Sequence, residues 1–382
     1  MKSTLLTTTA LIAFAGAAFA DGHSANDGVS FSGVATLGYN NTTSTNSDGT
    51  DDDDSDAAVG VDTYDNEFGF YSDLEVTLGL SKALDNGLTV AASIDLEDLA
   101  DGADASGDYT LSVTSETASM YYGDTKFAAE SKWSEVGDMA ASSFSEQDGE
   151  TVLRGEGNVA GVDAAVSAVI NGDKTEQVSL GATATFGMFN LGLGYQDSAS
   201  TSFAASRDGS GADADGDTLL SGAANGDFNG NKVYAVSVGG SFAGADVALG
   251  YADNSVETST GISVAYPVGP VALSASYADN SVSIDAWNIA ATYAAGAITA
   301  TISTDEGDDY ALEGSYDLGN GAKVFAGVAD GGDDYYVAAS YDLGGGASVL
   351  ASYADDQADD SEDEVGANEY QNGATVELTF TF

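Results

Sequence analysis

The chain has 382 residues, of which 62 are Asp or Glu and only 9 are Lys or Arg, so its formal net charge is -53. This charge excludes nucleic acid as a partner, because phosphate binding requires clustered cations. The sequence contains no cysteine, which excludes disulfides and cysteine-based catalytic or metal sites. The hydrophobic fraction of 43% argues against a disordered acidic chain.

The N-terminus has the pattern of a secretory signal peptide. Lys2 precedes a short apolar run, which ends in the small-x-small sequence Ala18-Phe19-Ala20. The alternative is a transmembrane anchor, but the run is shorter than a membrane-spanning helix requires. We expect residues 1–20 to be removed and residues 21–382 to form one folded domain.

Apolar and polar residues alternate along the rest of the chain, in segments of roughly 7–12 residues. In the last segment, Val376, Leu378, Phe380 and Phe382 fall on one face, and Glu377 falls on the other with three threonines. Successive side chains of a strand point to opposite faces of a sheet. The pattern predicts an all-β protein of about 20 strands.

Two kinds of connection alternate between these segments. One kind is short and rich in glycine, such as residues 187–188 and 319–321, whereas the other carries most of the acidic residues, such as residues 40–65 and 354–372. A soluble sandwich has no reason to sort its connections in this way. A closed transmembrane barrel does, with short turns on one side, long loops on the other and aromatic rings at the membrane boundary. Candidate boundary residues are Tyr195, Tyr251, Tyr277, Tyr353, Trp133 and Trp287.

The strand–turn–strand unit repeats with a period of about 24 residues. Residues 309–331 and 334–355 are near copies of each other. A β-propeller or solenoid is the alternative, but neither sorts its connections by charge. In hydrocarbon every backbone N–H and C=O needs an internal partner, which a closed antiparallel barrel supplies. A barrel of 16 or more strands keeps a water-filled lumen.

The last third of the chain resembles the porins of alphaproteobacteria, the Rhodobacter type. The resemblance is carried by residues 340–349 (SYDLGGGASV), 353–355 (YAD) and 376–382 (VELTFTF), with a further likeness at residues 182–195. It implies a 16-stranded outer-membrane barrel embedded in lipid. It also implies a homotrimer, whose third outer loop folds into the lumen as a constriction. A terminal Phe382, with Phe380, is similar to the signal that outer-membrane assembly machinery reads.

The sequence departs from this family in two respects. The segments include about two additional hairpins between residues 231 and 331. Where the family places arginine on an early strand, this chain has Asp73 and Glu75. The basic wall of the constriction is therefore weakened or reversed.

These features predict an outer-membrane porin for passive diffusion of small hydrophilic solutes and ions. The loop that corresponds to the constriction spans about residues 134–149 by the resemblance. With acids on this loop and on the facing strand we expect cation preference, although solvated loop charges are the alternative. Arg154 is either a lumen base facing the loop or part of a plain ion pair. The candidate constriction residues are Glu135, Asp138, Glu146, Asp148, Arg154, Asp73 and Glu75.

Acidic clusters outside the strands are candidate calcium sites, because calcium prefers carboxylate oxygens. The densest cluster is Asp51-Asp52-Asp53-Asp54. None of the clusters has the spacing of the twelve-residue calcium loop, and a solvated acidic surface is the competing interpretation. No cofactor is required for transport.

Two other function classes remain open. A barrel without conductance could act through its acidic outer loops as an adhesin or receptor. A secreted, salt-adapted soluble β-protein or hydrolase would also be acidic. A Ser–His–Asp arrangement is not indicated, because His23 is the one histidine and lies outside any expected strand, so we expect no enzymatic activity.

Overall fold

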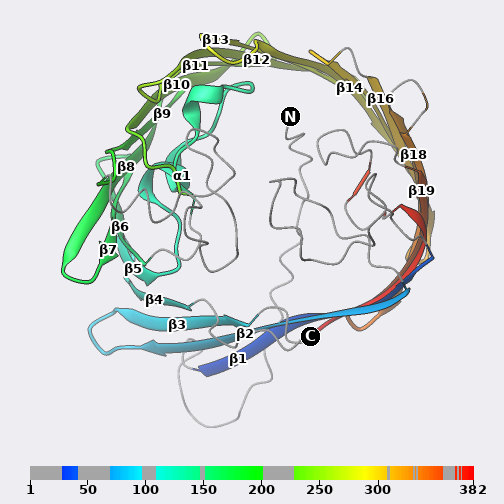
Figure 1. The fold of residues 1–382 in the computed structure, drawn as a ribbon, viewed down its shortest axis with the longest axis horizontal. Coiled ribbons are helices and arrows are strands. Elements are labelled where there is room, and N and C mark those ends of the chain that lie inside the picture. Colours follow the sequence, from blue (N-terminus) through cyan, green and yellow to red (C-terminus); the bar gives the residue numbers. More distant parts are fainter. Residues whose placement is uncertain are drawn as a thin grey trace, which may run out of the picture.

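The computed structural model is a twenty-stranded antiparallel sheet that closes into a barrel (Figure 1). It describes residues 28–41, 69–96, 109–146, 151–200, 228–307, 310–329, 332, 334–355, 366–367, 370 and 372–382. The last strand pairs with the first, so that Ala35 lies opposite Phe380 and Asn40 opposite Thr375. Phe382 exchanges both backbone hydrogen bonds with Gly33, at 2.9 and 3.1 Å. Each described strand therefore has a partner on both sides.

The strands follow one another around the barrel in sequence order. Their bounds are β1 Gly28–Asn40, β2 Gly69–Ala83, β3 Thr89–Leu96, β4 Tyr109–Thr114, β5 Ala118–Gly123, β6 Val152–Val159, β7 Val162–Asn171, β8 Lys174–Phe186, β9 Phe189–Gln196, β10 Val233–Phe242, β11 Ala245–Asp253, β12 Thr258–Val268, β13 Val271–Asn280, β14 Ala286–Ala295, β15 Ile298–Asp305, β16 Tyr310–Gly319, β17 Ala322–Ala329, β18 Asp334–Gly344, β19 Ala347–Asp355 and β20 Gly373–Thr381. Two short helices, α1 (Ala128–Lys132) and η1 (Ala140–Ser142), lie between β5 and β6.

The strand number agrees with the segments of the sequence and not with the 16 strands that the resemblance implied. The additional hairpins are complete, because every strand from β10 to β18 pairs with both of its neighbours. No helix within the described ranges is long and apolar enough to cross a membrane.

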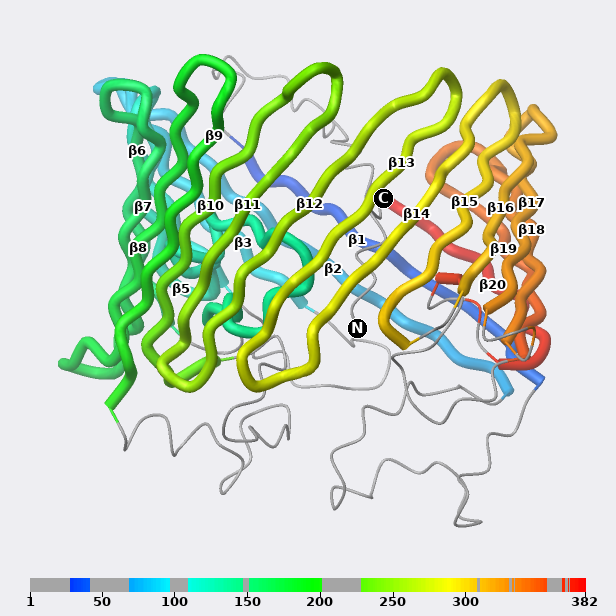
Figure 2. Tube along the Cα trace, turned by 90° about the horizontal axis from the view of Figure 1, so that it is seen from above, coloured from blue at the N-terminus to red at the C-terminus, as the bar shows by residue number. Residues whose placement is uncertain are grey.

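The short turns join strands at one edge of the sheet, and the strand ends that lead into the long connections lie at the opposite edge, as the sequence predicted. The short turns gather at one edge, which is uppermost in Figure 2. In the turn between β16 and β17, Asn320 and Gly321 both have positive φ, 56° and 86°. Two such residues form the tight turn that matches the twist of a hairpin.

The inner face of the barrel is identified by the segment between β5 and β6, which lies inside the ring (Figure 1). Its backbone contacts Ser167, Ser179 and Ser259. Residues that pair across neighbouring strands lie on the same face, so the inner face can be followed from strand to strand around the barrel. By this register the inner face includes Thr36 and Thr379. The wall is therefore polar inside, where small hydroxyl side chains are frequent.

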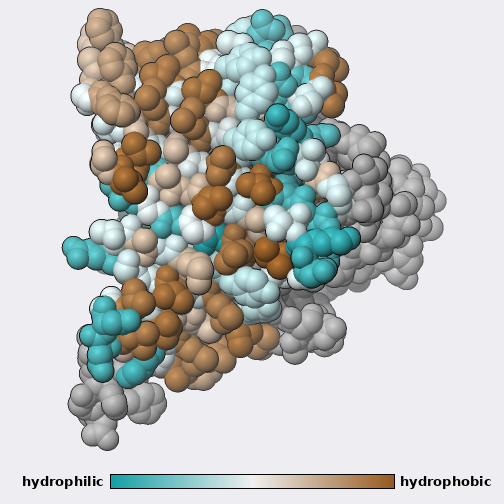
Figure 3. All heavy atoms as spheres, turned by 90° about the vertical axis from the view of Figure 1, so that its left-hand side faces the viewer, coloured by the Kyte–Doolittle hydropathy of each residue, from teal (hydrophilic) through white to brown (hydrophobic). Residues whose placement is uncertain are grey.

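The outer face carries the large apolar residues, and their side chains remain exposed. Apolar residues spread over the outer wall on the side seen in Figure 3. These apolar residues include Phe31 (69%), Leu37 (52%), Leu193 (51%), Leu249 (50%), Ile302 (54%), Val376 (55%), Phe380 (43%) and Phe382 (53%). Tyr251, Tyr277 and Tyr353 lie on the same outer face, near the edge opposite to the short turns. The sheet is thus inverted relative to a soluble protein, as a surface facing lipid requires.

Two neighbouring residues of β15 test which face meets lipid. Ile302 is exposed on the outer face, and Thr301 pairs with Thr292 on the inner face. We expect Ile302→Arg to destabilise the folded barrel in lipid vesicles by about 2–4 kcal/mol, because arginine at mid-membrane must lose its hydration. Thr301→Arg should leave stability nearly unchanged and alter conductance. Equal destabilisation in urea titrations would contradict this assignment of faces.

Candidate functional site

The segment between β5 and β6 folds into the barrel along its inner wall. It leaves the wall at Gly123, whose φ of 116° lets the chain turn inward, and it is described as far as Glu146. We call residues 124–146 the inward segment. It begins before residue 134, where the sequence placed the start of the constriction loop, and it includes both α1 and η1.

Hydroxyl groups of the wall anchor the start of α1. The backbone N–H of Ala128 donates to Ser167 Oγ at 2.8 Å, and that of Ala129 donates to Ser179 Oγ at 2.8 Å. The first N–H groups of a helix have no partner within the helix, so a buried helix start needs acceptors from elsewhere. β7 and β8 supply these acceptors.

The second half of the inward segment is held in the same way. The N–H of Ala141 in η1 donates to Ser259 Oγ at 3.0 Å. The N–H of Ser145 donates to Gln196 Oε1 at 2.8 Å, and its hydroxyl donates to Gln177 Oε1 at 2.9 Å. All three bonds are buried, so losing one acceptor costs about 1–3 kcal/mol.

Glycines of the inner wall leave room for the segment. A Cβ atom at Gly181 would overlap the carbonyl oxygen of Ala128, and one at Gly261 would overlap that of Val136. At these two glycines the backbone of the segment lies directly against the wall, whereas at Gly194 and Gly250 side chains of the segment fill the space that a Cβ atom would need. The glycines in this seat are Gly181, Gly194, Gly250 and Gly261.

The lysines of the inward segment are engaged in ion pairs. Lys132 Nζ lies 3.2 Å from both Glu156 and Asp163 on the wall, and Lys126 Nζ lies 2.6 Å from Glu130. Burial lowers the pKa of Lys132, but its hydrogen bonds with Asp163 and Glu156 outweigh this effect, and the pKa lies above the ordinary value. Lys132 is therefore protonated at neutral pH, and its positive charge is offset by the carboxylates of Glu156 and Asp163.

Arg154 lies on the inner face of β6 and is 9% exposed. Its Nη1 donates to the carbonyl oxygen of Lys126 at 2.7 Å, and its guanidinium lies 4.6 Å from the ring centre of Tyr121. Arg154 therefore lies on the inner wall and faces the inward segment. Arg154 joins the start of the inward segment to the wall.

The predicted acids occupy different positions. Glu135 Oε1 accepts from the N–H of Met139 at 2.7 Å and from the hydroxyl of Ser142 at 2.8 Å, so it stabilises η1. Asp138 and Glu146 are exposed on the segment. Asp148, like the calcium candidates Asp51, Asp52, Asp53 and Asp54, lies outside the described residues.

Asp73 and Glu75 lie on the inner face of β2, because the register pairs them with Thr36 and Val34. Glu377 of β20 lies on the same face, where it accepts a 3.1 Å hydrogen bond from the hydroxyl of Tyr71. The wall formed by the two ends of the chain is therefore acidic on its inner side.

Trp133 was placed wrongly by the sequence, which assigned it to the membrane boundary. It belongs to the inward segment and packs edge-on against Phe144, with ring centres 6.3 Å apart. The wall anchors such as Ser167 and Ser179 were missed altogether, because alternation marks every lumen-facing polar residue alike. Among the described residues, no group of three acidic or histidine side chains could hold a metal ion.

A closed barrel with an apolar exterior, a polar interior and a chain segment inside it defines a channel-type barrel of the outer membrane. Residues 7–361 match the family model described as Gram-negative porin, so the chain belongs to that family. It is therefore an outer-membrane porin, a channel and not an enzyme.

Individual relatives are distant. The chain is 24% identical to a porin of Rhodobacter capsulatus over 305 residues, which is 72% of this chain and 92% of that protein. Two solved structures of mutants of the Rh. blastica porin are each 16% identical, with a TM-score of 0.43, and cover 93% of this chain and 100% of theirs.

Adding one methyl group tests whether the wall glycines make room for the inward segment. We expect Gly261→Ala to push the carbonyl of Val136 into the lumen, lowering single-channel conductance and destabilising the barrel by about 1–3 kcal/mol. The control is Gly155→Ala on β6, where an added Cβ meets nothing within 4 Å. Equal conductance of the two variants would show that Gly261 does not position the segment.

Proposed function

We propose that the channel carries small hydrophilic solutes and ions by passive diffusion, and that it prefers cations. The observation that supports this preference is the state of the cations nearest the inward segment. Lys126 and Lys132 are paired with carboxylates, and Arg154 is buried against a carbonyl oxygen. Carboxylates offset the charges of the two lysines, and burial keeps the Arg154 guanidinium away from a passing solute.

Carboxylates, in contrast, line the inner wall through most of its circumference. A lumen lined by one sign of charge concentrates ions of the opposite sign. By the pairing register, the acidic residues on the inner face include Asp73, Glu75, Asp95, Glu156, Asp163, Asp246, Asp305, Glu313, Asp317, Asp342 and Glu377.

Reversal potentials in a KCl gradient across planar bilayers test the preference. We expect the sign of a cation-preferring channel at 0.1 M salt and a weaker preference near 1 M, where the screening length falls from about 10 Å to about 3 Å. The double variant Asp73→Asn with Glu75→Gln should reduce the preference. Asp85→Asn, in the exposed turn between β2 and β3, is the control and should not. An anion-preferring wild type would disprove the proposal.

We also propose that the porin is a homotrimer. β4 and β5 have six residues each, a length of about 20 Å at 3.3 Å per residue. Tilted by about 40°, they reach roughly 15 Å, less than the apolar band of about 25 Å that a membrane barrel presents. Leu111 and Met120 are exposed there, and a neighbouring copy would shield this low part of the wall.

Native mass spectrometry in detergent tests the assembly. We expect a mass of three chains and conductance that appears in groups of three equal steps. Leu111→Arg should favour the monomer, whereas Leu312→Arg, on the outer face of β16, should destabilise the barrel without changing the subunit number. A monomeric wild type with full conductance would refute the trimer.

The alternative is a barrel that acts through its acidic outer loops as an adhesin or receptor. That function would require no ion flow. Stepwise openings in bilayers separate the two, because an adhesin without an open lumen would give none.

A further inference from the structure

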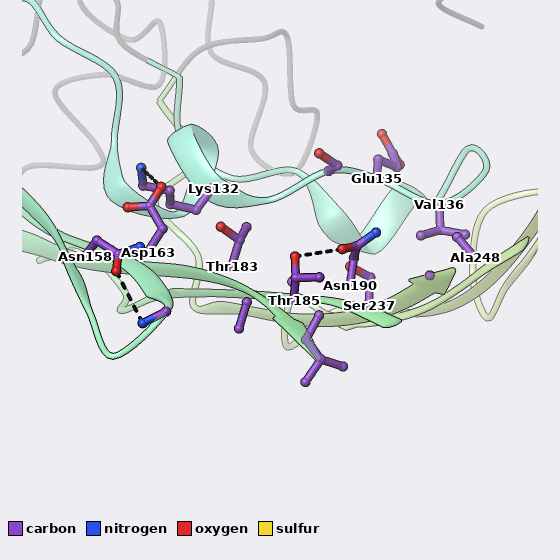
Figure 4. Close-up of a pocket in the computed structure, with 16 residues that line it drawn as sticks. Lys132, Glu135, Val136, Asn158, Asp163, Thr183, Thr185, Asn190, Ser237 and Ala248 are labelled. Carbon is purple, nitrogen blue, oxygen red and sulfur yellow. Dashed lines mark hydrogen bonds and ion pairs between the residues drawn. The ribbon is translucent and has the colours of Figure 1, made fainter. Parts of the chain in front are cut away.

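A pocket of about 500 Å³, lined by charged, hydroxyl-bearing and apolar residues, lies between the inward segment and the inner faces of β6 to β11 (Figure 4). Lys132 and Glu135 of the segment form one side of it. The wall contributes Gly161, in the turn between β6 and β7, and Thr185 and Asn190, which flank the turn between β8 and β9. The pocket therefore lies towards the short-turn edge of the barrel, beside the narrowed part of the lumen.

The wall side of the pocket offers neutral hydrogen-bonding groups. Thr183 and Ser237 line it with their hydroxyl groups (Figure 4). Thr185 donates its hydroxyl to Asn190 Oδ1 at 2.9 Å, which fixes the orientation of that amide and leaves its nitrogen as a donor. Hydroxyl and amide groups lining one pocket suit a solute with several hydroxyl groups. None of the lining residues is aromatic, so the pocket does not select a flat ring.

The charges around the pocket favour a cation. Glu135 and Asp163 line it, and among the described residues Lys132 is the only cation that does. Lys132 is only 13% exposed and is shared between Asp163 and Glu156 at 3.2 Å each. One positive charge thus stands against three negative charges, and a protonated amine gains more here than a neutral or anionic group.

We propose that this pocket is a solute subsite for hydroxylated amines, which are small molecules with a protonated amino group beside several hydroxyl groups. The ammonium group binds towards Glu135 and Asp163, and the hydroxyl groups bond to Thr183, Ser237 and the amide of Asn190. This proposal rests on the proposed cation preference. It specifies the class of solute that the preference favours most.

Interruption of single-channel current by added solute tests the subsite. Glucosamine is the probe, and glucose and N-acetylglucosamine are comparisons that keep hydroxyl groups but lack the charge. We expect glucosamine to half-block the current at roughly millimolar concentration, as a weak site would. The neutral sugars should be at least about tenfold weaker, which corresponds to 1.4 kcal/mol. Equal block by all three sugars, or no block by glucosamine, would overturn the subsite.

Two variants locate the block. Ser237→Ala and Thr183→Val each remove one hydroxyl group and should weaken glucosamine block about fivefold while conductance remains. Thr301→Val removes an inner-face hydroxyl on β15, across the barrel, and should have no effect on block. If Thr301→Val weakens block as much as Ser237→Ala, the binding is spread over the lumen and the pocket is not the subsite.

The KCl reversal potential, measured in the same bilayers, separates this proposal from the proposed function. An anion-preferring potential with glucosamine block intact would refute the cation preference alone. A cation-preferring potential without block would refute the subsite alone.

Discussion

The structure depends on the pairing of β20 with β1, which leaves no open edge in the described sheet. An apolar solvent offers backbone N–H and C=O groups no partners, so a strand with a free edge would be too costly to place there. Closure allows the outer face to be apolar and the inner face to hold water. The difference in polarity between the two faces follows from closure, and so does the alternation of apolar and polar residues along the strands.

Inside the barrel, the inward segment also needs hydrogen-bond partners for its backbone groups, which closure provides for the strands. Its short helices have backbone groups without partners of their own, and the wall satisfies them through Ser167, Ser179 and Ser259, while Gln196 does the same for Ser145 after η1. Glycines let the segment approach closely enough for these bonds to form. The lumen is thus narrowed by a segment fixed along its length, both by these hydrogen bonds and by buried apolar side chains such as Phe127 and Met139.

The charges around the inward segment are unevenly distributed. The few cations beside the segment serve to fix it, Arg154 through a carbonyl oxygen and Lys132 through two carboxylates. They are too few to balance the acidic residues of the wall around them. Carboxylates outnumber cations at the pocket beneath the segment, so the proposed ion preference and the proposed subsite have one cause.

The sequence by itself determined the strands, their two faces, the sorting of the connections and the number of hairpins, because each is written in residues close together along the chain. Alternation in residues 374–382 correctly divided the side chains of the last strand between its two faces. Only the tertiary structure decided what meets inside the barrel. The role of Arg154, the interior position of Trp133, the glycine seat and the pocket all join segments distant in sequence. Local pattern reports which face a residue takes, but the contact it makes there depends on how the closed sheet brings the inward segment against the wall.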